Sequence, residues 1–324
     1  MIRTRALLLS LVASAWALAS LGTAAAQNYP DKPIRLVVAV AAGGPMDTMA
    51  RALAQQMQMK LGQPVVVENR TGAGTTIGAK SVATAEPDGH TLLWGTISMI
   101  AIAPVLYKDP GYDPWSLVPV ALVAEFPSLV VVSPTLPVKT WAEFAAYAKA
   151  HRGQLNYGGS LGTPPQLMGA QLNKVADLGM TYVPYRGGAP SIPDLISGRL
   201  HMQVDALTLL VPLVKEGKLR ALASQTPERW PSLPDVPTLR EVGFADFPGN
   251  AWGGIMAPPK TPRPIVEKLN ATVNEILRSP ETKATLDKFS VLLLPRSVDE
   301  FSAYIAKETP PWSAMVRESG ATAQ

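Results

Sequence analysis

The sequence predicts an α/β protein of two lobes, each built around a mostly parallel β-sheet. Two observations lead to this prediction. Apolar runs of strand length alternate along the chain with segments of helical periodicity, a pattern typical of parallel sheets covered by helices. Roughly 300 residues remain after the N-terminal segment described below, more than a single hydrophobic core usually holds. We therefore expect two lobes with a cleft between them.

The N-terminal part contains the pattern of a buried strand followed by an amphipathic helix. Ile34–Val40 is a continuous apolar run of strand length. Apolar residues then recur every three or four positions from Met46 to Leu61, and Gly62 is a helix stop. The same criteria predict strands at Pro64–Glu68 and Thr91–Trp94 and a helix at Ile77–Thr84.

The central part of the chain repeats this plan. Two apolar runs within Leu117–Val132 are interrupted at Glu125 and Pro127, and Thr140 is a suitable N-cap for a helix at Trp141–Ala150. A helix is also predicted at Pro164–Val175, and strands at Leu155–Tyr157, Tyr182–Tyr185, Met202–Ala206, Arg220–Ser224 and Ala251–Ala257. The tail, residues 264–320, is mostly helical, with one short strand at Val291–Leu294.

The N-terminus has the features of an export signal. A basic start at residues 1–5 precedes an apolar run from Ala6 to about Leu21, and Ala24 and Ala26 stand at the small-residue positions of a cleavage site. The run is shorter than the roughly 20 apolar residues that a membrane-spanning helix needs. The sequence therefore predicts a signal peptide at residues 1–26, cleaved near Ala26, and a mature protein in the periplasm.

Composition argues against several classes of function. The chain has no cysteine, so the export signal carries no lipid-attachment site and the fold no disulfide. Cleavage would remove Arg3 and Arg5 and lower the formal charge from +4 to +2, and no basic cluster is interleaved with aromatics, so we expect no nucleic acid partner. Three scattered histidines give no metal-ligand spacing, and Gly72–Gly78 has one residue too many for a dinucleotide loop. We expect no cofactor.

Two glycine-rich loops are candidate binding sites because each joins a predicted strand to a predicted helix. They comprise Ala42, Gly43, Gly44 and Asp47 in the first loop and Gly158–Pro164 in the second. Glycine lets a ligand approach the backbone, and the first turn of a helix presents unpaired N–H groups with a partial positive charge. Thr163 suits an N-cap position and Pro164 the first helical position. The pair could hold an anion such as a carboxylate, but both are equally compatible with ordinary helix starts.

A hydrolase is the alternative that the second loop leaves open. The segment from Gly158 to Gly162 matches the nucleophile motif G-x-S-x-G, with Ser160 between a predicted strand and a predicted helix. A hydrolase of that fold needs a histidine later in the chain, and only His201 follows the serine. A secreted serine hydrolase using Ser160 is therefore the less favoured interpretation.

A series of short stretches resembles the substrate-binding proteins of tripartite tricarboxylate transporters, also called the Bug family. In chain order they are Tyr29–Ile34, Ala42–Asp47, Leu61–Arg70, Gly72–Gly74, Pro87–Leu93, Val183–Pro190, Asp194–Leu195, Gly217–Ala223, Leu233–Thr238 and Ala257–Pro259. No single stretch is specific, but the series is. The chain differs from the family pattern at Ala39 and Val40, where Pro-Phe is usual, and at Gln166, where histidine is common. The second loop is also one residue short.

The resemblance implies a type II periplasmic binding protein, in which two lobes with mixed, mostly parallel sheets enclose a ligand cleft. The first lobe would comprise residues 27–126 and 250–324, and the second lobe residues 127–249. The family's ligands are small mono-, di- or tricarboxylates, amino acids and aromatic acids. By the match of motifs, the ligand-binding residues would be Ala42, Gly43, Gly44, Asp47, Thr96, Ser98, Ser160, Gly162, Thr163 and Asp205, the last facing the far end of the ligand.

Together, the residues and the resemblance predict a solute receptor and not an enzyme. The lobes would close on a small carboxylate, either a di- or tricarboxylate or an aromatic acid. The closed form would be recognised by the membrane subunits of a tripartite tricarboxylate-type transporter. A ligand-binding role in a sensing system is a further alternative, because no sequence motif distinguishes the two. By analogy with the fold class, we expect a monomer.

Overall fold

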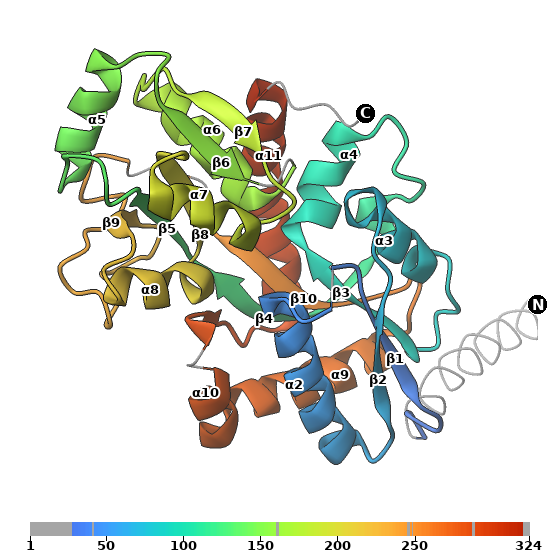
Figure 1. The fold of residues 1–324 in the computed structure, drawn as a ribbon. Helices are drawn as coiled ribbons and strands as arrows, with labels where there is room; N and C mark the ends of the chain where they lie inside the picture. Colours follow the sequence, from blue (N-terminus) through green and yellow to red (C-terminus); the bar gives the residue numbers. More distant parts are fainter. Residues whose placement is uncertain are drawn as a thin grey trace, which may run out of the picture.

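The computed structural model describes residues 28–40, 42–159, 162–244, 247, 249–286 and 289–319. The signal peptide predicted at residues 1–26 and the candidate residue Ser160 lie outside these ranges. Figure 1 shows two neighbouring α/β units, each with helices packed around one β-sheet. We call the unit around the first sheet the first lobe and the other the second lobe.

The first sheet has six strands in the order β11-β4-β10-β3-β1-β2. Their bounds are β1 (Ile34–Val38), β2 (Val65–Asn69), β3 (Thr91–Thr96), β4 (Val118–Phe126), β10 (Ala251–Ala257) and β11 (Leu292–Leu293). β1 is parallel to both neighbours, with Val37 opposite Glu68 on one side and Leu93 on the other. β10 is antiparallel to β3 and to β4, so the sheet is mixed.

The second sheet has five strands in the order β7-β6-β8-β5-β9. Their bounds are β5 (Ser128–Val132), β6 (Asn156–Gly159), β7 (Thr181–Pro184), β8 (Met202–Ala206) and β9 (Arg220–Ser224). β6 is parallel to β7 and to β8, whereas β5 is antiparallel to β8 and β9. The predicted fold class, two lobes with mixed sheets, is therefore confirmed as two separate sheets. Two of the five strand pairs in the first sheet and two of the four in the second are parallel, so the sheets are less parallel than the sequence predicts.

Helices follow most of the strands. The α-helices are α2 (Pro45–Leu61), α3 (Thr76–Ala83), α4 (Ala103–Leu106), α5 (Trp141–Ala150), α6 (Pro164–Val175), α7 (Ile192–Ser197), α8 (Leu207–Lys215), α9 (Arg263–Arg278), α10 (Pro280–Leu286) and α11 (Val298–Ser319). Short turns form the 3-10 helices η1 (Ala73–Thr75), η3 (Pro114–Ser116) and η4 (Ala189–Ser191), and η2 (Ser98–Ile102) is a π-helix. Within the described ranges, no helix has the length and apolar character needed to cross a membrane.

The chain passes from the first sheet to the second through a very short connection. β4 ends at Phe126 and β5 begins at Ser128, so Pro127 alone separates them. The return, residues 225–250, is longer and forms one isolated parallel bridge between Ser224 and Thr238. The two sheets are thus joined at the ends of their strands.

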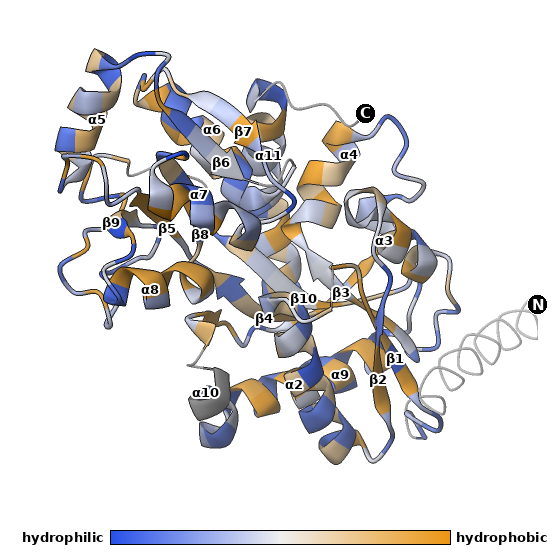
Figure 2. Cartoon of the chain, in the orientation of Figure 1, coloured by the Kyte–Doolittle hydropathy of each residue, from blue (hydrophilic) through white to orange (hydrophobic). Residues whose placement is uncertain are grey.

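The helices bury one face against the sheets, as their periodicity predicts. On α2, Met49 and Met57 are completely buried and Leu53 is nearly so, which places a stripe of spacing four against the first sheet. In Figure 2, α2 and α9 carry hydrophilic as well as hydrophobic residues, as expected for helices that cover a sheet on one side and face water on the other. Trp94 and Trp252 are also fully buried, so both indole rings belong to the core.

The long helix α11 contacts both lobes. It begins with a capping box, in which the N–H of Glu300 donates to Ser297 Oγ and the N–H of Ser297 donates to the Glu300 carboxylate. Pro310 and Pro311 lie inside the helix, so two backbone carbonyls of the preceding turn lack a helical N–H donor. Near its end, the ion pair between Lys174 Nζ and Glu318 Oε2, at 2.9 Å, connects α11 to α6 of the second lobe.

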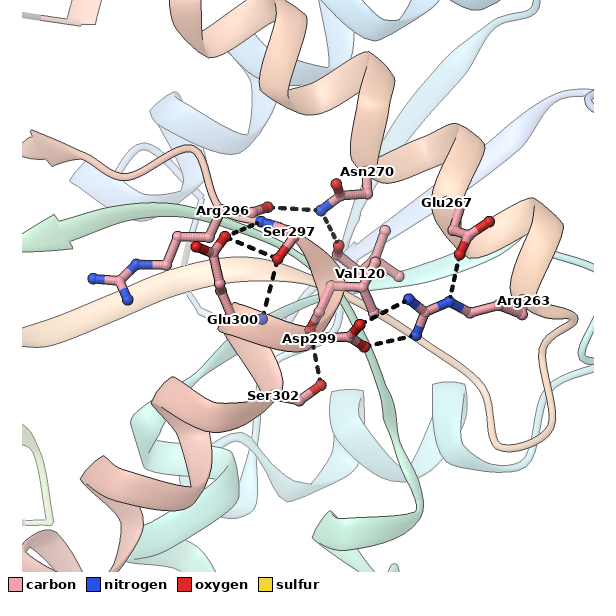
Figure 3. A network of polar contacts seen from close by, with 10 residues as sticks. Val120, Arg263, Glu267, Asn270, Arg296, Ser297, Asp299, Glu300 and Ser302 are labelled. Atoms are coloured by element: carbon pink, nitrogen blue, oxygen red, sulfur yellow. Dashed lines mark hydrogen bonds and ion pairs between the residues drawn. The ribbon is translucent and has the colours of Figure 1, made fainter.

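A buried amide connects β4, α9 and the segment before α11 (Figure 3). Asn270 Nδ2 donates to the carbonyl of Val120 at 2.7 Å and to the carbonyl of Arg296 at 2.9 Å. Asn274 Nδ2 donates to the same Arg296 carbonyl at 2.8 Å. Val120 falls between Pro119 and Ala121 at an irregularity of the β4–β10 pairing, so it has no partner residue on β10. The two amides therefore stabilise the attachment of the C-terminal segment to the first sheet.

We expect Asn270→Ala to lower the free energy of unfolding by about 1–3 kcal/mol, because the Val120 carbonyl then loses its side-chain donor and the Arg296 carbonyl loses one of two. Urea unfolding followed by circular dichroism measures the change. Thr272→Ala is the matched control on the exposed face of α9, where the hydroxyl bonds only the carbonyl of Lys268, and it should change stability by less than about 0.5 kcal/mol. Equal effects of the two substitutions would contradict this role.

Candidate functional site

Strand directions bring the predicted loops of the first lobe to one edge of its sheet. β1 and β3 are adjacent and parallel, so the residues after Val38 and after Thr96 leave the sheet on the same side. Gly253 of β10 lies opposite Thr96, and Ala251 lies opposite Phe126 at the end of β4. The connection to the second lobe therefore starts from the edge that carries the candidate loops.

The second lobe meets this edge with the equivalent ends of its own strands. Ser128, the first residue of β5, lies opposite Ala206, the last residue of β8. Because β6 is parallel to β8, the loop that follows Gly159 emerges at the same end. Contact across the lobes is direct: a Cβ atom on Gly162 would lie 2.7 Å from Leu106 Cδ1 of α4. The two loops thus lie at the facing edges of the two sheets, where ligands bind in open α/β folds.

Asp47 holds the first loop in place from inside. The N–H of Gly43 donates to Asp47 Oδ2 at 2.9 Å, and Asn69 Nδ2 donates to Asp47 Oδ1 at 2.8 Å and to the carbonyl of Val40 at 3.1 Å. Arg51 Nε adds a bond of 3.0 Å to Oδ2. The Asp47 side chain is only 2% exposed, so its carboxylate is occupied by protein donors.

These donors also fix the charge of Asp47. Burial by itself raises the pKa of this carboxyl, but the hydrogen bonds from Arg51, Gly43 and Asn69 outweigh burial and lower the pKa below its ordinary value. Asp47 is therefore ionised at neutral pH and holds the loop most firmly in that form. Ala42 and Gly43 are exposed beside it, and Gly44 is the N-cap residue of α2 without a side-chain cap.

The second loop is held in the same way as the first, by a side chain four residues after a glycine. Gly162 has a positive φ of 71°, as Gly43 has at 82°, and its N–H donates to Gln166 Oε1 at 3.2 Å. Gln166 is 4% exposed and lies in the first turn of α6. In each loop, therefore, a side chain in the first helical turn binds the N–H of a glycine in the left-handed region, where a Cβ would be strained.

Thr163 takes the predicted N-cap position of α6, and Pro164 the first helical position. The threonine hydroxyl makes no capping bond to the first turn of the helix. The first turn is therefore ordered by Gln166 and not by the threonine that the sequence favours as the cap.

Thr96 and Ser98 lie at the end of β3 and in the turn that follows it. Thr96 is the last residue of the strand and is 2% exposed. Ser98 is half-buried and begins the π-helix η2, a rare conformation that is enriched at functional sites. The η2 carbonyls are bound from outside, Met99 by Tyr112 Oη at 2.7 Å and Ala101 by Ser313 Oγ at 3.1 Å. Within the described chain, the Ser98 hydroxyl has no hydrogen-bond partner.

Asp205 lies at the end of β8 against the loop after β7. Its Oδ1 accepts from the N–H of Ala206 at 2.8 Å and its Oδ2 accepts from Gln203 Nε2 at 3.0 Å. A Cβ on Gly188 would lie 1.9 Å from Oδ2, so only glycine fits there. Gln203 is itself bound by Ser191 Oγ at 2.6 Å, and both of these side chains are completely buried. Burial raises the pKa of Asp205, and the hydrogen bonds from Ala206 and Gln203 only partly offset it.

Sequence reasoning missed the residues that orient these groups, namely Asn69, Arg51, Gln203 and Ser191. Asn69 lies 22 positions from Asp47, and no local pattern relates the two. The pairing of a loop glycine with an acceptor side chain four residues later, in Gly43–Asp47 and in Gly162–Gln166, is a signal that could have been found. Among the residues that the structure describes, no group of three or more His, Asp or Glu side chains could hold a metal ion.

The histidine that a hydrolase would need lies at the wrong end of β6. His201 Nδ1 is 3.0 Å from Asn156 Oδ1, and the His201 N–H donates to the same oxygen at 3.2 Å. Asn156 begins β6, whereas Gly159, which precedes the motif serine, ends it roughly 10 Å away. The position of His201 therefore does not support a nucleophile–base pair with Ser160.

We expect Asp47→Asn to lower the free energy of unfolding at pH 7 by about 1–3 kcal/mol, because the charged acceptor of three hydrogen bonds is lost. The stability from the ionised carboxylate is present above the unfolded pKa of about 4 and is lost as the pH falls through the lower folded pKa. The variant should thus lose less stability than the wild type between pH 5 and pH 2.

Urea unfolding at several pH values measures this difference. Asp109→Asn is the matched control, because exposed Asp109 also accepts a glycine N–H, that of Gly111 at 2.7 Å. A variant at position 47 with the same pH profile as the wild type would exclude this role for the carboxylate.

Comparison with known proteins agrees with this geometry. The protein family described as "Tripartite tricarboxylate transporter family receptor" matches residues 49–321 of the chain. The chain is 34% identical to Protein BugT of Bordetella pertussis (strain Tohama I) over 305 residues, 91% of this chain and 92% of BugT. It is also 39% identical over 258 residues to a protein of Agrobacterium vitis, covering 79% of this chain and 74% of the relative.

Solved structures share the whole fold. The periplasmic binding protein BugD has a TM-score of 0.78 and 33% identity, with 91% of this chain and all of that chain covered. A protein of R. palustris with adipate has a TM-score of 0.81 and 33% identity, covering 91% and 99%. MatC from Rhodopseudomonas palustris with bound malate has a TM-score of 0.77 and 35% identity, covering 89% and 100%. These likenesses confirm the periplasmic binding-protein fold and the resemblance found in the sequence, and the chain belongs to the receptor family of tripartite tricarboxylate transporters.

Proposed function

We propose that this protein is a periplasmic receptor that binds one small carboxylate between its two lobes and delivers it to a transporter. The observation that carries the proposal is the repeated loop design, in which Gly43 and Gly162 are each held by a side chain four residues later at the start of a helix. Both loops lie at the junction of the lobes. The adipate and malate bound to two similar proteins are ligands of this class.

The helix starts favour an anion. The first turns of α2 and α6 begin with proline and have no hydrogen bond from an N-cap side chain. Because proline has no N–H, the first-turn donors are the N–H groups of Met46 and Asp47 in α2 and that of Gln166 in α6. Their partial positive charges attract a carboxylate placed between them, and such an arrangement requires no arginine or lysine. This is the physical basis for assigning the site to an acid and not to a neutral solute.

Each candidate residue has a role in this proposal. Ala42, Gly43 and Gly44 contact the carboxylate from the first loop, and Ser160, Gly162 and Thr163 contact it from the second. Thr96 and Ser98 add hydroxyl groups from the first lobe, and Asp205 faces the far end of the ligand. Asp47, with its carboxylate bound internally, positions the first loop.

The proposal assigns residues 27–126 and 250–324 to the first lobe and residues 127–249 to the second. The hinge then consists of Pro127 and the return segment that ends at Asn250. Rotation about Pro127 and this segment would close the lobes on the ligand. The membrane subunits of the transporter would recognise the closed, monomeric form.

The remaining assignments follow from this role. The protein binds its ligand without converting it, since His201, the histidine that follows Ser160 in the sequence, lies beside Asn156 at the start of β6, whereas Gly159 ends that strand. Cleavage of the signal peptide near Ala26 would release residues 27–324 into the periplasm.

A thermal-shift screen of residues 27–324 tests the proposal. The panel contains mono-, di- and tricarboxylates, aromatic acids, amino acids and uncharged analogues of each. A ligand at 100 times its dissociation constant adds about 2.7 kcal/mol of stability, which is a shift of several degrees. We expect shifts from one class of carboxylate. Shifts only with uncharged compounds, or none at all, would rule out the carboxylate assignment.

Ser98→Ala should weaken binding of the carboxylate found in that screen by about tenfold, because one ligand hydrogen bond is lost. Since Ser98 has no hydrogen-bond partner within the described chain, the melting temperature without ligand should stay the same. Isothermal titration calorimetry measures the affinity. Ser116→Ala is the control, because its hydroxyl bonds only the carbonyl of Asp113 and its loss should leave affinity intact. Unchanged affinity in Ser98→Ala would remove Ser98 from the site.

A further inference from the structure

A buried polar cluster lies beside the segments that connect the two lobes. Glu125 is the penultimate residue of β4, one position before Phe126 and two before Pro127. Asn250 immediately precedes β10, at the end of the return segment. Tyr304 and Glu308 are one turn apart on α11. The cluster therefore joins both interlobe connections to the helix that packs across them.

Glu125 is fully bonded within this cluster. Tyr304 Oη donates to Glu125 Oε1 at 2.7 Å, and Asn250 Nδ2 donates to Glu125 Oε2 at 3.0 Å. The carboxylate thus binds α11 with one oxygen and the return segment with the other. Both oxygens of Glu125 therefore act as acceptors.

Glu308 is in a different position. Its side chain is 8% exposed and packs against the backbone of the return segment, where a Cβ on Gly249 would lie 2.3 Å from Glu308 Oε2. Within the described chain, Glu308 Oε2 is buried without a hydrogen-bond partner, and the same holds for Oδ1 of Asn250, the residue next to Gly249. An ionised Glu308 would leave two buried acceptors unpaired near a second carboxylate. A proton on Glu308 would add an O–H donor to this group of acceptors.

The charges around Glu308 act in both directions. Burial is the main cause that raises the pKa of this carboxyl, and the charge of Glu125 on β4 raises it further. Lys307 on the same helix, the backbone N–H of Gly249 and Arg296 before α11 oppose the increase but do not cancel it. Arg296 lies 5.1 Å from the ring centre of Tyr304, the remaining titratable neighbour.

We infer that Glu308 and Glu125 form a proton-dependent latch that holds residues 249 and 250 of the return segment against α11 and β4. In the latched state Glu308 carries a proton, and both oxygens of Glu125 accept hydrogen bonds. When Glu308 loses its proton, repulsion between the two carboxylates and the unpaired acceptors favour release of the segment. Because the hinge of the proposed function includes this segment, the mobility of the lobes becomes coupled to pH.

The direction of the coupling follows from linkage. A carboxyl whose pKa is higher in the latched state favours that state below the pKa of the released state, and this preference is lost as the pH rises through the higher value. The latch is therefore firm in acid and loosens toward neutral and alkaline pH. Ligand release would be easier at the higher pH.

Hydrogen–deuterium exchange without ligand tests the latch. The protein, residues 27–324, is measured between pH 5 and pH 8, and rates for peptides that cover residues 249–253 are corrected for the intrinsic effect of pH. We expect protection to fall by about tenfold over this range as Glu308 loses its proton. Glu308→Gln, which is neutral and keeps a donor, should stay protected at all pH values. Exposed Glu275→Gln on α9 should behave like the wild type.

Two further variants keep the test decisive. Glu125→Gln removes the repulsion and should reduce the change with pH, and Gly249→Ala should remove protection at every pH because its Cβ would collide with Glu308. A Glu308→Gln protein with the wild-type pH dependence would overturn the inference, as would a wild type without one. Since no ligand is present, failure of the carboxylate screen would leave this result unaffected.

Discussion

The single-residue connection at Pro127 is the constraint on which the arrangement of the two lobes depends. A link this short allows little separation between the end of β4 and the start of β5, so one edge of each sheet must meet. The registers then decide which loops meet there. In the first lobe these are the loops after β1 and β3, and in the second lobe the loops after β6 and β8. Had β5 run in the other direction, the loops of the second lobe would face away from the first.

The elements with strong local signals could be predicted from the sequence. The bounds of α5 and α6 agree with expectation because Thr140 and Pro164 mark their starts, and Thr140 Oγ1 indeed accepts the N–H of Glu143 at 3.2 Å. β1 ends at Val38, two residues earlier than its apolar run suggests. The reason is that the carbonyl of Val40 accepts a hydrogen bond from the Asn69 side chain in the loop and not from a neighbouring strand. The π-helix η2 could not be predicted, since its carbonyls are bound by residues far along the chain.

The candidate site shows the same division between local and tertiary information. The two glycine loops were found because strand, glycine and helix start are contiguous in sequence. The side chains that set their geometry were not, because Asn69 and Gln203 act across elements. The sequence predicts Asp47 as a ligand contact and marks Gln166 as a departure from the family pattern. In the structure both have the same internal role, because each accepts the N–H of a loop glycine. Conformation at a loop is therefore readable from sequence, but which side chain remains available to a ligand depends on the three-dimensional network around it.

In each loop, the hydrogen bond from a glycine N–H to the side chain four residues later, Gly43 to Asp47 and Gly162 to Gln166, acts as a clasp. This clasp also has an evolutionary consequence. It engages the side chains of Asp47 and Gln166, so the loops present main-chain atoms to the space between the lobes, and main-chain atoms are unchanged by most point mutations. Gly162 has no room for a larger residue beside Leu106. In the proposed site, divergence in what such a protein recognises would therefore be confined to positions outside the clasp, such as 98 and 205. One lineage could change its repertoire of solutes many times while keeping the same anchor.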